Sequence, residues 1–258
     1  MFHTIQEVHG SEGEVYGGNL TIYEDDQAIV GHDDTSQVYP VRCIKGPVSG
    51  TMTDGRDGKT YKTVRIGNQV WMAENLNYAY TEKTADLDSS SFCHLDDGTG
   101  DRGAANCAKY GRYYLWSAAM DSAGIISSNG AGCGFGSTCS PSSRVRGVCP
   151  EGWHLPKKEE FESLITSVGG ATEGGKKLKS TESGGIPGTD DFGFSAILTG
   201  EYYNGFGNEG LARYWSSSDE NSETSAYFML LNTYDPKVEL KNIPYTKEYG
   251  FSVRCIED

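Results

Sequence analysis

The chain has 258 residues, of which 36% are hydrophobic and 22% charged, and its formal net charge is −14. This is the composition of a globular protein, and so acidic a surface repels phosphate backbones and anionic lipid headgroups, which argues against nucleic acid and membrane surfaces as partners. No apolar run approaches the roughly 20 residues needed to cross a bilayer, so the sequence predicts no membrane-spanning segment.

The first 46 residues read as strands and turns. The stretch "NLTIYEDDQAIVG" (19–31) predicts a hairpin with Glu24, Asp25 and Asp26 at its turn. A linker is expected at 47–52, within "KGPVSGT", and a larger domain from 53 to 258. The N-terminus has no basic segment followed by an apolar one and so does not resemble a signal peptide. This conflicts with the cysteines described below, and the conflict suggests a piece of a longer precursor.

The next segments contain one hairpin and two helices. Two strand-like runs within 59–76 meet at Gly67-Asn68, a favoured hairpin turn pair, and residues 77–110 read as loop. Apolar residues at helical spacing predict one helix within "GRYYLWSAAMDSAG" (111–124) and a longer one within "LPKKEEFESLITSVGG" (155–170). Pro156 suits the first turn of the second helix, and Gly169-Gly170 would end it.

The rest of the chain reads as loops followed by strands. Loops extend to about Cys149 and again from the second helix to Arg213. Strands are then expected in "RYWSSS", "SAYFMLLNT", "KVELKN" and "YGFSVRCI". This order predicts an α+β fold in which the first and last strands are free to pair.

Seven cysteines occur, and none has the spacing of a zinc site. Local spacing suggests the disulfides Cys93–Cys107 and Cys133–Cys139. A third, Cys149–Cys255, would tie the chain end to its middle and leave Cys43 unpaired. Such a set indicates an oxidising compartment. Six cysteines allow 15 pairings, and a reduced chain with buried thiols is the alternative.

The tetrapeptide "VRCI" occurs at 41–44 and again at 253–256. Each copy follows a strand, an acidic turn, a strand and a polar turn, and an aromatic residue, Tyr39 or Phe251, stands two positions before it. Residues 1–46 are therefore predicted to be a β tail resembling the C-terminal end of a preceding repeat, with Cys43 in the place of Cys255. Chance similarity of two short β segments is the alternative.

Several motifs from Gly50 to Asp258 occur in a recognisable order. They are "DGKTYKTVRIGNQVWMAENLNY", "CAKYGRYYLWSAAM", "VRGVCPEGWHLPKKEEFESL", "GTDDFGFSAI", "YWSSS" and "YGFSVRC". Together they resemble the Fibrobacter succinogenes major paralogous domain. The resemblance implies a secreted or surface-displayed bacterial protein, from a family without an established enzymatic activity.

That family is in turn similar to C-type-lectin-like folds, including the formylglycine-generating enzyme group, through the helix entry at Trp153–Pro156 and the terminal segment Gly250–Cys255. This implies a small twisted antiparallel sheet with two helices and long disulfide-stapled loops. The calcium–sugar triplets of C-type lectins are absent, since "NIPY" (242–245) lacks the acid, and no redox cysteine pair matches the formylglycine enzymes. Neither site is carried over.

Other motif-like segments favour structural roles. Gly170–Lys176 fits the start of a phosphate loop, but Lys177 stands where the magnesium-binding Ser or Thr belongs. Ser195 lacks the second glycine of a nucleophile elbow, and His154 has no nucleophile beside it in sequence, so we expect it to be packed and hydrogen-bonded. The four tryptophans are expected in the core.

Two loops remain as candidate sites. Asp96, Asp97 and Asp101, between Cys93 and Cys107, could hold calcium, with solvated loop acids as the alternative and no other cofactor expected. Four aromatic residues in a Gly/Asn-rich loop could offer their faces to carbohydrate or protein, with structural packing as the alternative. They are Tyr202, Tyr203, Phe206 and Tyr214.

We therefore expect a non-enzymatic binding module, extracellular or at the cell surface, that presents aromatic loops to carbohydrate or protein. The first alternative is a structural subunit of a surface fibre or tandem-repeat adhesin, self-assembling through its N-terminal tail by strand addition. The second is an enzyme that uses paired loop carboxylates.

Overall fold

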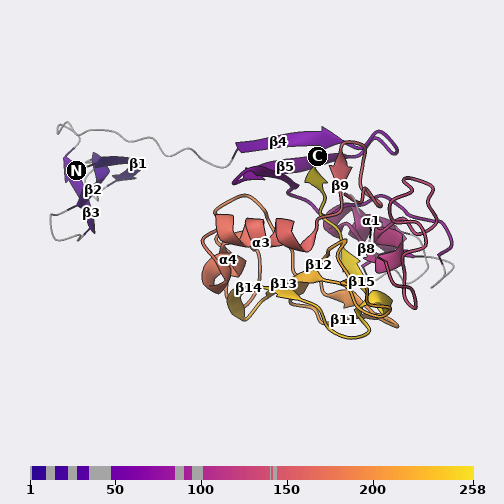
Figure 1. Ribbon diagram of the computed structural model, residues 1–258. Coiled ribbons are helices and arrows are strands. Elements are labelled where there is room, and N and C mark those ends of the chain that lie inside the picture. Colours follow the sequence, from indigo (N-terminus) through magenta and orange to yellow (C-terminus); the bar gives the residue numbers. More distant parts are fainter. Residues whose placement is uncertain are drawn as a thin grey trace. The chain divides into compact units, whose positions relative to one another are not determined.

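The computed structural model describes residues 2–9, 15–22, 28–34, 48–84, 90–94, 101–139, 141 and 144–258, with side chains from residue 48 onward except at 101–102. The chain divides into two compact units, Met1–Gly46 and Pro47–Asp258. The N-terminal unit contains an antiparallel sheet of β1 (Phe2–His9), β2 (Val15–Ile22) and β3 (Ala28–Asp34), in that order (Figure 1). Leu20 pairs with Val30, which confirms the predicted hairpin; Glu24, Asp25 and Asp26 lie outside the described residues.

One sheet of the C-terminal unit has five strands in the order β4-β5-β6-β16-β9. Their bounds are Val48–Thr53 (β4), Thr60–Ile66 (β5), Gln69–Met72 (β6), Trp153–His154 (β9) and Ile256–Glu257 (β16). The hairpin of β5 and β6 turns at Gly67-Asn68 as predicted, and Gly67 has a φ of +60°, which glycine adopts readily. The last strand, β16, pairs with both β6 and β9, so the chain end lies in the middle of this sheet.

The predicted linker at 47–52 is wrong for most of its length. Residues 48–53 form β4, which pairs with β5 from Val48↔Arg65 to Thr53↔Thr60. The Gly, Pro and Ser residues of "KGPVSGT" suggested a flexible connection, but Val48 and Thr51 are β-branched and pair readily in a strand. The C-terminal unit therefore begins at Pro47.

The second sheet has eight strands. Six follow the order β11-β10-β15-β12-β13-β14, while β8 pairs with β15 and β7 pairs with β8. Their bounds are Ser91–Cys93 (β7), Arg112–Leu115 (β8), Glu201–Tyr202 (β10), Phe206–Gly207 (β11), Leu211–Trp215 (β12), Phe228–Asn232 (β13), Asp235–Lys241 (β14) and Gly250–Ser252 (β15). The strands predicted after Arg213 are therefore confirmed, and the fold is α+β with mostly antiparallel sheets.

The helices differ more from expectation. They are α1 (Asp101–Tyr110), α2 (Trp116–Ala119), α3 (Lys158–Ser167), α4 (Ala171–Leu178) and the 3-10 turn η1 (Thr246–Glu248). Helix α1 lies in a stretch expected to be loop. The helix expected at 111–124 is mostly the strand β8 followed by the single turn of α2. Helix α3 begins after Pro156, not with it, and α4 occupies the Gly170–Lys176 segment, where a loop was expected.

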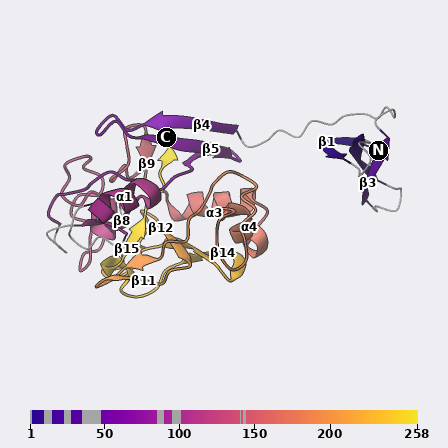
Figure 2. The same ribbon diagram turned by 180° about the vertical axis from the view of Figure 1, so that it is seen from behind.

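Helix α3 lies between the two sheets, as both views show (Figures 1 and 2). Its Phe161 ring stacks on Trp71 of β6, with ring centroids 5.4 Å apart, and Leu164 belongs to the same buried cluster as Leu231 of β13. A second cluster gathers around Trp116, Trp215 and the Cys149–Cys255 disulfide. All four tryptophans are buried, as predicted.

Candidate functional site

The predicted aromatic loop forms a short hairpin, which we call the aromatic hairpin (residues 201–207). Its strands β10 and β11 pair at Tyr202↔Phe206, and the backbone N–H of Tyr203 donates to the carbonyl of Gly205 at 2.8 Å. Asn204, with a φ of 51°, helps to close the turn, because Asn tolerates the left-handed region better than most residues. The hairpin joins the larger sheet through the pairing of Tyr202 with Gly250.

Side chains on this hairpin divide between its two faces, because successive residues of a strand point in opposite directions. Tyr202 stacks on Phe92 of β7 at 4.0 Å, and Phe206 contacts Tyr202 edge-on at 5.2 Å. Tyr203 faces the other way and stacks on Tyr249 at 4.4 Å. Tyr203 remains 44% exposed, whereas Tyr202 and Phe206 are half-buried.

Tyr214 does not join this surface. It lies in β12, its exposure is 0%, and its ring packs edge-on against Phe194 at 5.9 Å. Its assignment as a ligand-contacting residue is therefore wrong. The sequence placed Tyr214 next to the hairpin, but the alternation of β12 turns its side chain into the core.

His94 lies beneath the aromatic hairpin, next to Phe206 at 5.6 Å between ring centroids. The Tyr113 hydroxyl donates to the carbonyl of Thr199 at 2.8 Å, so its oxygen accepts from Nδ1 of His94 at 3.1 Å. Burial lowers the pKa of His94, against a smaller opposing effect of the Glu209 carboxylate. A neutral imidazole thus links β7, β8 and the loop before the hairpin.

Glu201 anchors the start of the hairpin. Its buried carboxylate forms an ion pair with Nη1 of Arg213 in β12 and accepts a hydrogen bond from Nδ2 of Asn208. Burial lowers the pKa of Arg213. Separating such a pair would leave a buried charge without its partner, which is strongly destabilising. The ion pair therefore fixes the position of the hairpin on the sheet.

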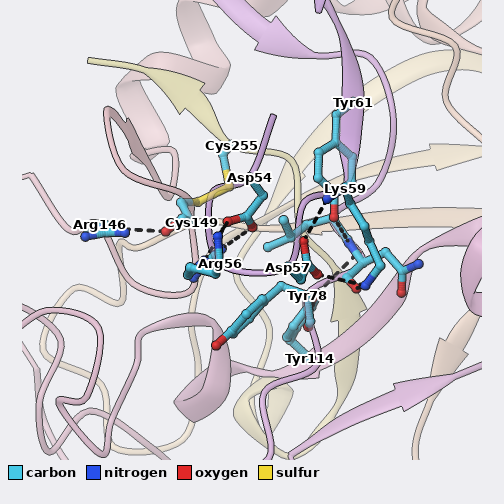
Figure 3. Close-up of polar contacts among 12 residues, drawn as sticks. Asp54, Arg56, Asp57, Lys59, Tyr61, Tyr78, Tyr114, Arg146, Cys149 and Cys255 are labelled. Atoms are coloured by element: carbon cyan, nitrogen blue, oxygen red, sulfur yellow. Dashed lines mark hydrogen bonds and ion pairs between the residues drawn. A yellow bond between two sulfur atoms is a disulfide. The ribbon is translucent and has the colours of Figure 1, made fainter. Parts of the chain in front are cut away.

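A second polar cluster lies at the turn between β4 and β5, beside the Cys149–Cys255 disulfide (Figure 3). Arg56 donates to the buried Asp54 carboxylate through Nη2 at 2.7 Å and Nε at 2.9 Å, and its guanidinium lies 3.8 Å above the ring centre of Tyr78. Burial disfavours the Asp54 carboxylate, but the bonds from Arg56 outweigh it and lower its pKa. These contacts hold the turn rigid.

The loop that the sequence suggested for calcium lies mostly outside the described residues. Asp96, Asp97 and Cys43 lie outside the described residues, and Asp101 begins α1 with its side chain not described. Among the described residues, no group of three His, Cys, Asp or Glu side chains could hold a metal ion. His154 is buried and hydrogen-bonded as predicted, with Nδ1 2.9 Å from Asp258 Oδ1 and Nε2 3.0 Å from Glu160 Oε1.

Comparison with protein-family models identifies the family of the C-terminal unit. Residues 64–257 match the model of the Fibrobacter succinogenes major domain. The chain belongs to this family. The matched region runs from within β5 to the last strand and so includes the aromatic hairpin, while β4 and the N-terminal unit lie outside it. No curated protein and no solved structure matches the chain.

This Fibrobacter succinogenes major domain contains three disulfides, the pairs that the spacing suggested: Cys93–Cys107, Cys133–Cys139 and Cys149–Cys255. In the part of the chain that the structure describes, no helix is long and apolar enough to cross a membrane. Sequence reasoning missed the partners Phe92, His94 and Tyr249, which lie far from the hairpin in the chain. One available signal was the position of Phe92 and His94 on either side of Cys93.

Proposed function

We propose that this protein is an extracellular, non-enzymatic module that binds carbohydrate through the aromatic hairpin. The observation that carries the proposal is the stacked pair of Tyr203 and Tyr249, which leaves the Tyr203 ring 44% exposed. A tyrosine ring held in place offers apolar area to a sugar ring at little entropy cost. Asn204, the next residue in the hairpin turn, is exposed and offers its amide group to sugar hydroxyls.

A C-type-lectin-like architecture is part of the proposal. Three disulfides in a chain rich in long loops support an oxidising, extracellular compartment. Two mostly antiparallel sheets of short strands, with the terminal strand β16 between β6 and β9, support a scaffold that presents loops for binding. A rigid scaffold with ligand-contacting loops is a common arrangement in binding proteins.

The test is a glycan array followed by titration calorimetry of the full chain. Replacing Tyr203 by Ala is expected to weaken binding about tenfold, because it removes the exposed ring while leaving Tyr249 in place. Tyr234→Ala serves as the control, since this tyrosine is 78% exposed at the turn between β13 and β14. Absence of glycan binding, or equal effects of both substitutions, would contradict the proposal; capture of a protein partner by Tyr203 would reassign the ligand class.

A structural role in a tandem array is the second candidate, and the repeated tetrapeptide favours it. In the C-terminal unit, the antiparallel pair β13–β14 precedes Val253–Ile256, which are all buried. In the N-terminal unit, the antiparallel pair β2–β3 precedes the same tetrapeptide at 41–44, which lies outside the described residues. Size-exclusion chromatography of the full chain tests self-assembly through this tail; a strict monomer at all concentrations argues against it.

A further inference from the structure

A continuous groove of mixed polar and apolar lining crosses the C-terminal unit, and none of the aromatic-hairpin residues lines it. A hollow of about 440 Å³ adjoins one of about 330 Å³ through Glu74, Lys109 and Ile197. It also adjoins a hollow of about 500 Å³ beside β4, through Lys62 and Ser195. The groove therefore extends from β4, across β5, to the C-terminal end of α1.

One wall of the groove is a strained turn held from two sides. Ser195 has a φ of 51°, in the left-handed region that serine rarely adopts. Its backbone N–H and hydroxyl both donate to the Asp190 carboxylate, at 2.7 and 2.6 Å, and its carbonyl accepts from Nη2 of the buried Arg254 at 3.0 Å. Strain of this kind persists only where surrounding contacts enforce it, and it is concentrated at functional sites.

The opposite wall is the end of α1, which is equally fixed. The Cys93–Cys107 disulfide ties the helix to β7, and Nδ2 of Asn75 donates to the carbonyl of Tyr110 at 2.9 Å. Gly111 follows with a φ of +75°, and a Cβ there would lie 2.5 Å from Cβ of Asn75. Both walls are therefore formed before any ligand arrives, which lowers the entropy cost of binding.

The charge of the groove differs from that of the chain. Among the described residues, the groove is lined by three lysines, Lys59, Lys62 and Lys109, and by two acids, Glu74 and Glu182, whereas the whole chain carries a net charge of −14. Lys59 is already paired with Asp57 at 2.8 Å, near Tyr61 in Figure 3. Among the described residues, the ammonium groups of Lys62 and Lys109 have no carboxylate within ion-pair distance.

We propose that this groove binds an acidic oligosaccharide, with sugar carboxylates paired to Lys62 and Lys109. The half-buried Tyr110 ring supplies apolar area for a sugar face, and Nζ of Lys109 lies 4.8 Å from its centre. Glu74 and the hydroxyl groups of the 180–183 loop supply partners for sugar hydroxyls. A peptide fits less well. Of the residues that the structure describes, Ala73, Ile197 and Leu198 supply the aliphatic side chains around the central hollow, which are too few to hold apolar anchors.

This proposal rests on the proposed carbohydrate-binding function and adds a second binding site to it. The experiment that tests the groove does not depend on the aromatic hairpin. Calorimetry of the full chain compares oligogalacturonate with a neutral cello-oligosaccharide of the same length. We expect the acidic sugar to bind at least about tenfold more tightly and to weaken with added salt, because exposed charge pairs are screened. Equal binding of the two sugars, or no binding of either, would overturn the proposal.

Two double variants with equal changes in charge test whether the groove lysines bind the sugar. Lys62→Gln with Lys109→Gln is expected to weaken oligogalacturonate binding about tenfold. Lys237→Gln with Lys241→Gln changes two lysines of β14, outside the groove, and is expected to leave binding unchanged. Equal losses in the two double variants would show a general charge effect and overturn the assignment.

Two further arms separate the remaining explanations. In the first arm, oligoglutamate of the same charge is compared with oligogalacturonate. If oligoglutamate binds as tightly as the sugar and competes with it, the groove is an acidic-peptide site and the sugar assignment is overturned. If Tyr203→Ala abolishes oligogalacturonate binding while the groove variants keep it, the ligand belongs to the aromatic hairpin; the groove proposal then fails and the proposed function stands. Unchanged thermal melting of each variant shows that the changes are local.

Discussion

Glu160 shows how a half-buried carboxylate is kept ionised in this domain. It accepts from the backbone N–H of Lys157 at 2.8 Å, and its other oxygen lies 3.0 Å from Nε2 of the buried His154. Burial disfavours the carboxylate, but these two hydrogen bonds outweigh it and lower the pKa of Glu160 below its ordinary value of 4.5. The carboxylate therefore stabilises the start of α3, where its negative charge also interacts favourably with the positive end of the helix dipole.

Replacing Glu160 by Gln should lower the free energy of unfolding by about 2 kcal/mol at neutral pH. A carboxylate whose folded pKa is depressed contributes stability above its unfolded pKa, and this contribution is lost as the pH falls through the folded value. The difference between the wild type and Glu160→Gln should therefore shrink as the pH falls below 4.5. Denaturant unfolding across a pH series measures it, with Glu162→Gln, exposed on the same helix, as the control. A pH-independent difference would contradict this origin.

Lys179 is buried, and its ammonium group is held by backbone carbonyls. Its ammonium donates to the carbonyls of Ile186, Asn232 and Asp235 at 3.0, 2.9 and 3.2 Å. Lys179→Met keeps the apolar stem but leaves three acceptors without their donor, so we expect the free energy of unfolding to fall by about 3 kcal/mol. Lys176→Met, at a half-buried position in α4, should change it by less than about 1 kcal/mol. Similar losses in the two variants, measured by urea unfolding, would argue against the carbonyl contacts as the cause.

At the scale of elements, α4 packs unusually close to β14 because two consecutive glycines face the strand. A Cβ on Gly175 would lie 2.0 Å from the carbonyl oxygen of Lys237, and one on Gly174 would lie 2.7 Å from Val238 Cγ1. Glycine inside a helix is destabilising by about 1 kcal/mol relative to alanine. The close packing of the helix on the strand outweighs this cost.

Gly175→Ala should therefore destabilise the domain by about 3 kcal/mol, even though alanine is the better helix former, because the clash is with backbone that cannot move aside. Thr172→Ala makes a somewhat smaller gain in helix propensity at an exposed position of α4 and should be neutral or slightly stabilising. Thermal unfolding of both variants measures the contrast. A stabilised Gly175→Ala would mean that propensity, and not close packing, governs this helix.

The same glycines explain why the sequence did not predict α4. "ATEGGKKL" has low helix propensity, and its one buried apolar side chain, Leu178, gives no periodic stripe. In contrast, the hairpin at Gly67-Asn68 and the strand Phe228–Asn232 were predictable from local turn and strand preferences. Helix α1 was missed because its polar sequence suggested a loop. Local signals fail where distant partners, here β14 and the Cys93–Cys107 disulfide, decide the conformation.

The candidate site was predictable only in part, for the same reason. Composition alone drew attention to the aromatic residues near Tyr203, and that residue is exposed. Which ring faces solvent depends on strand register, and Tyr214 is buried because the alternation of β12 turns its side chain into the core. The groove between Lys62 and Lys109 unites residues from separate elements, so no single stretch of sequence could indicate it.

At the scale of the whole molecule, the disulfides act over different lengths of chain. Cys149–Cys255 joins residues 106 positions apart and brings the C-terminal strand to the loop before Trp153, whereas Cys93–Cys107 spans 14 positions. The backbone reinforces the longer link, since the N–H of Met72 donates to the carbonyl of Cys255 at 3.0 Å. The chain end is therefore fixed to both the beginning and the middle of the C-terminal unit.

Replacing both Cys149 and Cys255 by Ala should lower the free energy of unfolding by about 4.7 kcal/mol, and the matched replacement of Cys93 and Cys107 by about 3 kcal/mol, because a cross-link that closes a longer loop restricts the unfolded chain more. All four cysteines are buried, so the change in packing is similar in the two variants and the difference reports the loop length. Guanidinium unfolding of both double variants and of the oxidised wild type measures it. Equal losses, or a larger loss for the shorter loop, would show that local contacts and not chain entropy govern these disulfides, and would place the main stabilisation of the fold in its two buried clusters.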